Sequence, residues 1–155
     1  MINIRKAKIE DIDNLIILWI KLMEYHKEKK IYFLLSADWK EQKRNELEWI
    51  VKSDLTVVYI VEEGNKLIGY IRGTIHKLPL LYDIKYEGSI EEIFILPEYR
   101  RKGYATKLFQ SLVKDFNKRE LEYININVDI ENETGKKFWD ALGFNTISLK
   151  KRYNL

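Results

Sequence analysis

The sequence predicts a mixed α/β (α+β) fold, with a central mixed sheet flanked by about four helices. Segments with helical periodicity alternate along the chain with short runs of β-branched and aromatic residues. Near the middle, a strand is followed by a basic turn, a helix and a further strand, and a right-handed crossover of this kind sets its two strands parallel. The chain of 155 residues contains no repeat or linker, so we expect one domain over residues 1–155.

The first part of the chain predicts a strand and two helices, at residues 2–8, about 9–28 and about 38–52. Apolar side chains recur at helical spacing from Ile12 to Met23, after acidic residues that suit the positive end of the helix dipole. Asp38 or Ser36 is the candidate N-cap of the second helix.

Two strands then form a predicted hairpin, because the run "DLTVVYIVEEGNKLIGYIRGTIHKL" carries a tight-turn signal at Gly64-Asn65. Gly69 and Gly73 interrupt the side-chain surface of the second strand, which indicates a bulge or a close approach of backbone there. A loop through Pro79 to Tyr86 follows.

A fourth strand is predicted at about 89–96 and ends before Pro97, which cannot donate to a ladder. A basic turn leads into a helix that begins near Ala105 and presents a broad apolar stripe. The remaining chain predicts a fifth strand, a last helix that ends at Gly143 and a closing strand, at about 123–128, 133–142 and 144–151.

The composition excludes several kinds of site. Without cysteine there is no disulfide or thiolate nucleophile, and with only His26 and His76 no metal site is expected. The net charge of +3 is spread along the chain, so nucleic-acid binding is not indicated. The N-terminus lacks a signal-peptide pattern and no apolar run reaches ~18 residues, so we expect a cytoplasmic protein with no membrane contact.

The basic turn "RRKGYA" lies where a strand gives way to a helix. Backbone N–H groups at a helix N-terminus lack intrahelical partners and can bind a phosphate. Gly103 allows close approach of the main chain, and small Ala105 leaves the approach open. Arg100, Arg101 and Lys102 attract negative charge. A polyphosphate is the favoured ligand, and the alternative is a solvated loop whose glycine serves only the turn.

Two motifs carry a resemblance to a known family. Arg100, Gly103 and Ala105, preceded by "IFILPEY", match a pattern of Arg or Gln, two residues, Gly, one residue, then Gly or Ala. Further on, "NETGKKFWDALGF" supplies an Asn, aromatic residues and a Gly-Phe ending, with Gly135 where alanine is commoner. Together, and in this order of elements, they resemble the acetyl-CoA-binding signature of the GCN5-related N-acetyltransferase (GNAT) superfamily over essentially the whole chain.

The resemblance implies a GNAT-like N-acetyltransferase that uses acetyl-CoA as co-substrate and no metal. Its parallel fourth and fifth strands would splay apart, and the pantetheine arm would pair with the main chain of Phe94 and Ile95 like an added strand. Asn132 would contact the cofactor across the cleft, and it is also a candidate N-cap for the final helix. The pyrophosphate would be held by the amides of Arg101, Lys102, Gly103, Tyr104, Ala105 and Thr106.

Acetyl transfer to an amine needs a group that takes up the amine proton. Glu91 and Glu92 are the candidates, and because they are adjacent on a strand we expect them to point to opposite faces. Glu92, which shares its face with Phe94, is the favoured base, although either face could be the cleft. A backbone N–H near Ile95 would meet the oxyanion.

Trp139 departs from the family pattern, which often has a tyrosine there to protonate the leaving thiolate. An indole N–H cannot take that role. Tyr104 or Tyr153 could substitute, or the thiolate could leave unassisted. Trp139 itself is interpreted as a wall of the cofactor cleft or a core aromatic.

The acceptor is the least determined part of the reaction. The end of the first helix and the following loop carry Tyr25, His26 and Tyr32, which we take as candidates for an amine pocket. A small-molecule amine and a peptide amine both stay open, as does a homodimer. The alternatives to an enzyme are a catalytically silent acyl-CoA-binding sensor or partner-binding module, and a nucleic-acid-binding domain, which the short basic cluster disfavours.

Overall fold

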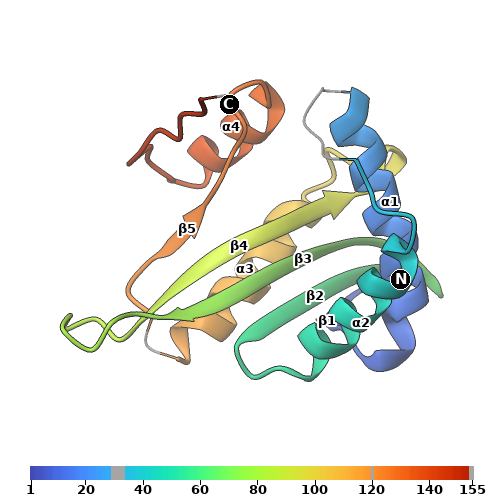
Figure 1. The fold of residues 1–155 in the computed structure, drawn as a ribbon. Coiled ribbons are helices and arrows are strands. Elements are labelled where there is room, and N and C mark those ends of the chain that lie inside the picture. The colour runs from blue at the N-terminus through green and yellow to red at the C-terminus, as the bar shows by residue number, and fades with distance from the viewer. Residues whose placement is uncertain (29–33, 120, 154–155) are drawn as a thin grey trace.

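The fold is a five-stranded sheet with helices on both sides (Figure 1), seen in a computed structural model that describes residues 1–28, 34–119 and 121–153. The strands lie side by side in chain order. β1 to β4 are antiparallel neighbours, and β5 runs parallel to β4, which confirms the predicted mixed sheet. The strands are β1 (Ile2–Lys6), β2 (Thr56–Glu63), β3 (Lys66–Lys77), β4 (Tyr86–Ile95) and β5 (Ile124–Ile126).

The predicted helices are confirmed, with small shifts at their ends. The first one begins as a short 3-10 turn, and Asp38 precedes the second without a capping hydrogen bond from its side chain. No helix within the described residues is long and apolar enough to span a bilayer. The helices are α1 (Ile12–Glu28), α2 (Trp39–Lys52), α3 (Tyr104–Asn117) and α4 (Glu133–Ala141), with 3-10 turns η1 (Ile9–Asp11) and η2 (Pro97–Tyr99).

The helices form two layers, because α1 and α2 cover one face of the sheet, hereafter the front face, and α3 covers the back face (Figure 1). Side chains alternate accordingly along β3. Tyr70 and Arg72 line a small pocket with residues of α1 and α2. A Cβ at Gly73 would instead lie 2.7 Å from Phe116 of α3. Toward the β3–β4 turn no helix lies in front of the sheet (Figure 1).

The hydrophobic core lies on both sides of the central strands. Leu108, Leu112 and Phe116 of α3 are buried on the back face, and Leu15 and Ile50 are buried under the front helices. Each such side chain stabilises the fold by ~1.5–3 kcal/mol relative to an exposed position. These packed layers hold β3 and β4 in place and so position the groups that project from them.

The β2–β3 hairpin follows the prediction. Its turn contains Gly64 with a positive φ of 60°, which a glycine adopts without strain. The ladder shifts register between Val61 and Glu62, opposite the start of β3. At Gly69 a Cβ would lie 2.6 Å from the carbonyl oxygen of Phe94, so the predicted close approach of backbone is confirmed there.

The parallel strands β4 and β5 pair over a short length only. Gly88 to Ile90 of β4 face Ile124 to Ile126 of β5, and β4 then continues to Ile95 while β5 turns away toward α4 (Figure 1). This splay confirms the expected arrangement of the fourth and fifth strands. It leaves the β5-side edge of β4 beyond Ile90 outside this ladder.

The closing strand predicted at about 144–151 is wrong, because these residues form no strand in the described part of the chain. After Gly143 (φ 91°) the chain folds back, with the amide of Phe144 donating to the Trp139 carbonyl and the Phe144 ring packing against Trp139. Ile147 and Leu149 are exposed. Alternating apolar residues make a strand only where a ladder partner is available.

Candidate active site

A β-bulge in β4 sets the directions of the two candidate carboxylates. The ladder pairs Arg72 with Glu92 and Gly73 with Ile90, so Glu91 is an extra residue between them. A bulge of this kind adds one residue to a strand and interrupts the alternation of its side chains. The glycine on the facing strand was the signal in the sequence, since it was expected to mark a bulge.

Glu91 and Glu92 both lie on the front face, so the prediction that they point to opposite faces is wrong. Glu92 meets Tyr70 and Arg72, which line the front pocket. Glu91 contacts His76, which has the same parity on β3 as Tyr70 and Arg72. Regular alternation holds only in an unbroken strand, and the bulge breaks it between these two residues.

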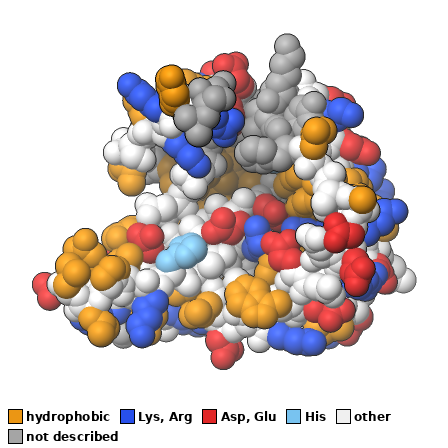
Figure 2. All heavy atoms as spheres, in the orientation of Figure 1, with side chains coloured by type: hydrophobic (Ala, Val, Ile, Leu, Met, Phe, Trp, Pro, Cys, Tyr) orange, Lys and Arg blue, Asp and Glu red, His pale blue; other side chains and the backbone are white. Residues whose placement is uncertain are grey.

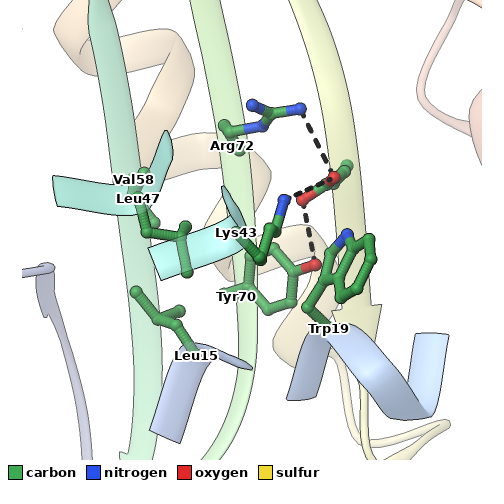
Figure 3. Close-up of a pocket in the computed structure, with 8 residues that line it drawn as sticks. Leu15, Trp19, Lys43, Leu47, Val58, Tyr70 and Arg72 are labelled. Atoms are coloured by element: carbon green, nitrogen blue, oxygen red, sulfur yellow. Dashed lines mark hydrogen bonds and ion pairs between the residues drawn. The ribbon is translucent and has the colours of Figure 1, made fainter. Parts of the chain in front are cut away.

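Glu92 lies in a partly buried charge cluster beneath α1 and α2 (Figure 3). Its carboxylate accepts a hydrogen bond from the Tyr70 hydroxyl at 3.0 Å and from Arg72 Nη2 at 3.3 Å, and Lys43 Nζ is 3.8 Å away. The side chain of Glu92 is 14% exposed and that of Lys43 only 6%. Burial, and then the charge of Glu92, raise the pKa of Tyr70 well above its usual value, so its hydroxyl stays protonated and donates.

The same cluster is closed by α2. Glu46 accepts from Lys43 Nζ at 2.8 Å and from Arg72 Nη1 at 3.1 Å, so two carboxylates balance two cations. The Lys43 ammonium also lies 4.5 Å from the ring centroid of Trp19, a cation–π contact. Sequence reasoning missed this cluster, because its members come from four elements and share no motif.

Glu91 has different neighbours on the open part of the front face. The Ser89 hydroxyl donates to Glu91 Oε1, and His76 Nε2 lies 2.7 Å from Ser89 Oγ and 3.6 Å from Glu91 Oε1. The side chains of Glu91 and His76 are partly exposed, at 34% and 46%. Figure 2 shows acidic side chains and a histidine along the hollow that crosses this face.

The basic turn at the start of α3 has the geometry of an anion site. Gly103 precedes the helix with φ 78°, Arg101 also has a positive φ of 63°, and nothing lies within 4 Å of where a Cβ on Gly103 would be. The first hydrogen bond of the helix runs from the Lys107 amide to the Gly103 carbonyl. The amides of the residues before Lys107 in this first turn therefore have no intrahelical acceptor.

Arg100 does not join the other basic side chains of this turn. Its Nε donates to the Ile95 carbonyl at 2.9 Å, and its guanidinium lies over the rings of Tyr25 and Phe94 at 5.1 and 5.6 Å. Arg101 and Lys102 are exposed. Arg100 therefore ties the end of β4 to α1, while the exposed pair is available for a negatively charged ligand.

The final helix matches the second motif as a structural unit. Asn132 Oδ1 accepts from the Gly135 amide at 3.0 Å, which confirms its reading as the N-cap of α4. A Cβ at Gly135 would lie 2.5 Å from Asn132 Nδ2, so an alanine here would require the Asn132 side chain to shift. Trp139 is buried and packs edge-on against three aromatic side chains, one each from α3, α4 and the segment after α4, namely Phe109, Phe138 and Phe144.

The candidate acceptor residues lie at the end of α1. His26 is half-buried, and burial lowers its pKa although the charges of Glu92 and Asp129 oppose this shift. These two charges come from β4 and from the segment after β5, so His26 lies beside the splay. Tyr32 lies outside the described residues. Of the two tyrosines considered as thiolate acids, Tyr104 is half-buried and Tyr153 is 88% exposed.

The described residues contain no group of three His, Asp or Glu side chains that could hold a metal ion. The site therefore consists of a splayed strand edge, a helix N-terminus without intrahelical acceptors, and two carboxylates near the apex of the splay. Such a site can hold an extended phosphate-bearing ligand and can take a proton from a second substrate.

A profile of the "Acetyltransferase (GNAT) family" matches residues 19–144. Among curated proteins, the chain is 23% identical over 126 residues to the [ribosomal protein bS18]-alanine N-acetyltransferase of Haemophilus ducreyi, covering 69% of this chain and 87% of that protein. It is 27% identical over 156 residues to the N-alpha-acetyltransferase of Saccharolobus solfataricus, covering 97% and 84%.

Solved structures show the same fold. The structure of a "predicted acetyltransferase with acetyl-CoA" from Clostridium acetobutylicum superposes with a TM-score of 0.80 at 22% identity, over 99% of this chain and 96% of that one. The aminoglycoside N-acetyltransferase AAC(6')-Iy in complex with CoA superposes with a TM-score of 0.80 at 20% identity, over 100% and 95%.

Proposed function

Because the chain belongs to the acetyltransferase (GNAT) family, we propose that it acetylates the α-amino group at the N-terminus of a peptide or protein. As a member it is an acetyl-CoA-dependent N-acetyltransferase, and the acceptor is the part that we propose. The observation that carries the proposal is that relatives matched over most of their own length are named for alanine N-acetylation and for N-alpha-acetylation.

The splay supports a place for acetyl-CoA. The pantetheine arm would lie along the outer edge of β4 beyond Ile90, adding a strand where β5 turns away. Its pyrophosphate would bind the first-turn amides of α3, with Gly103 allowing the approach and Arg101 and Lys102 contributing charge. The far side of the cofactor cleft would be bordered by α4. Asn132, its N-cap, and Trp139, on its buried side, would hold this helix in place rather than contact the cofactor by side-chain chemistry.

An α-amine suits the proton chemistry of the site. The nitrogen must lose a proton before it attacks, and an α-amino group has a pKa of about 7.7–8.0, against about 10.4 for lysine. The amine nitrogen then bonds to the carbonyl carbon, the carbon–sulfur bond breaks, and the thiolate takes a proton as it leaves. A backbone N–H of β4 near Ile95 would stabilise the oxyanion.

The open front face gives a peptide room to enter. The strands toward the β3–β4 turn are not covered by α1 or α2, and a hollow crosses this face (Figure 2). Tyr25 and His26 at the end of α1 would border the acceptor on one side. His26 would be mostly neutral at pH 7, because burial lowers its pKa, and so would not repel an incoming amine.

The test is to incubate the protein with acetyl-CoA and each amine of a panel, and to measure turnover as the release of free CoA. The proposal expects a short peptide with a free N-terminus to be turned over at least ~10-fold faster than the same peptide with a blocked N-terminus and an internal lysine. Preference for the lysine, for a polyamine or for an aminoglycoside would overturn the proposal that the acceptor is an α-amino group. Binding of acetyl-CoA without any turnover would instead support the silent sensor.

A further inference from the structure

The bulge places the carboxylates of Glu91 and Glu92 on the same face of the sheet, and their different surroundings suit them to different roles. We propose that Glu91, oriented by Ser89 and His76, takes the proton from the acceptor amine, and that Glu92 is a positioning residue. The inference rests on the proposed function only in that the reaction is acetylation of an amine. It names residues, Ser89 and His76, that no sequence motif singled out.

Glu92 is poorly suited to accept a proton. Its carboxylate already faces Arg72 and Lys43 and accepts from the Tyr70 hydroxyl. Protonating it would leave two cations, one of them buried, facing a neutral acid, with Glu46 alone to compensate them. The cluster instead braces α2 against β3 and β4, which fixes the strands just below the bulge.

Glu91 has the opposite surroundings. Its nearest donor is the neutral Ser89 hydroxyl, and its side chain is one third exposed on the uncovered part of the front face. A carboxylate that contacts a hydroxyl and an imidazole rather than Lys or Arg, and that has access to water, can gain a proton and release it again. The charged and titratable groups around it are His76 of β3, Glu87 and Glu92 of its own strand, and His26 of α1 near Glu92.

The hydrogen-bond directions show how Ser89 and His76 act. A serine hydroxyl has one hydrogen, and Ser89 directs it to Glu91. His76 Nε2, 2.7 Å from Ser89 Oγ, must then be the donor of that contact, so its ring carries a hydrogen on Nε2. His76 thus turns the serine hydroxyl toward Glu91, and the pair holds one carboxylate oxygen while the other stays available for the amine.

The position of Glu91 fits an acceptor that meets the thioester. Gly88 to Ile90 are the last residues of β4 paired with β5, so Glu91 is the first residue beyond the apex of the splay. A strand-like arm that starts at the α3 turn and runs back along β4 reaches this apex at its far end. An amine that enters over the open front face meets the arm there, beside Glu91.

The proton balance is complete without a further reactant. The ammonium form of the acceptor gives one proton to Glu91, which passes it to water. The neutral nitrogen attacks the thioester carbon, and as the carbon–sulfur bond breaks, the second amine proton ends on the CoA sulfur. The products are the N-acetylated acceptor, CoA with its thiol protonated, and one proton in solution.

The experiment compares Glu91→Gln with Glu92→Gln and Glu87→Gln on the best amine of the panel, whatever its class. Glu91→Gln should lower kcat by about 10²- to 10⁴-fold at pH 7 with the Kd for acetyl-CoA unchanged, and the deficit should shrink toward pH 9, where the amine deprotonates unaided. Glu87→Gln, a carboxylate of the same strand, should leave kcat unchanged. Glu92→Gln should lower stability and show no deficit that high pH restores.

Variants of the positioning pair sharpen the test. Ser89→Ala and His76→Phe should each lower kcat by about tenfold, because they remove a hydrogen bond that orients a charged group. His76→Gln keeps an N–H donor and should recover most of that loss.

Wild-type kcat for Glu91→Gln from pH 6 to 9 would overturn the inference, as would a pH-restored deficit in Glu92→Gln alone. Preference for lysine over the α-amine would overturn the proposed acceptor and leave this comparison valid. A wild-type protein that acetylates no amine would overturn both.

Discussion

The two halves of the cleft are built from different parts of the chain. The half proposed for acetyl-CoA is made of backbone: the outer edge of β4 and the first turn of α3 behind Gly103. The half beneath α1 and α2 is made of side chains, where Glu92, Arg72, Lys43 and Glu46 compensate one another. The first half therefore depends on the main-chain conformation, and the second on the balance of side-chain charges.

The two halves therefore differ in which substitutions impair them. Backbone donors survive most side-chain changes and fail only where the main-chain conformation itself needs one residue type. In the charge cluster, loss of one carboxylate leaves the buried Lys43 and its neighbour Arg72 with a single opposite charge, and this lowers stability.

The largest effect should come from Glu92→Leu. It leaves Arg72 and Lys43 with Glu46 alone, so we expect the free energy of unfolding to fall by about 3 kcal/mol, at the low end for a broken buried pair because Glu46 still contacts both cations. Urea denaturation measures this change. Glu87→Leu is the matched control and should cost under about 0.5 kcal/mol. Equal losses of unfolding free energy in the two variants would show that the charge cluster around Glu92 does not stabilise the fold.

Gly103→Val should weaken acetyl-CoA binding by ~10-fold or more, because the position has φ 78° and the side chain would block approach to the first-turn amides. Calorimetric titration gives the Kd. Gly64→Val is the matched control, since Gly64 also has a positive φ of 60° and open space but lies in the β2–β3 turn. An unchanged Kd in folded Gly103→Val would refute the backbone-built half.

Trp139→Phe should keep turnover within about threefold and lower stability by about 1–2 kcal/mol, because the ring is buried among Phe109, Phe138 and Phe144. Trp139→Tyr tests whether a phenol there raises the rate. Steady-state turnover and thermal unfolding distinguish packing from catalysis. A collapse of turnover in Trp139→Phe with unchanged acetyl-CoA affinity would give the indole a direct part in the reaction.

The smallest effect concerns His26, whose pKa is lowered by burial. The unfolded chain then binds more protons at this residue than the folded one, so stability rises with pH and is lost as pH falls below the unfolded value of about 6.5. His26→Gln should therefore reduce the drop in thermal midpoint between about pH 7.5 and 5.5. If the thermal midpoint of the variant falls as much as that of the wild type, groups other than His26 cause the pH dependence.

Much of the fold was predictable because its signals are local. The helical stripe of α3, the Gly64-Asn65 turn and the stop at Pro97 each depend on a few neighbouring residues, and all three appear where the sequence indicated them. The Gly103 turn at the start of α3 was equally readable, because a helix N-terminus preceded by glycine is a short-range pattern.

The failures share one cause, which is dependence on a distant partner. The segment 144–151 alternates like a strand but meets no ladder, and Glu92 follows Glu91 onto the same face because no residue of β3 pairs with Glu91. Arg100 turned back to Ile95 and Tyr25 for the same reason, since only the assembled end of β4 offers that carbonyl and ring.

The order of the elements and the basic turn at Gly103 follow from the sequence alone, because hydrophobic periodicity and helix ends are properties of contiguous residues. The surroundings of each carboxylate, in contrast, depend on how distant segments pack together. Glu91 and Glu92 are chemically identical neighbours in the chain. A bulge against β3 places Glu91 beside a serine and a histidine, and Glu92 beside Arg72 and the buried Lys43, and charge environment is a property of what packs nearby.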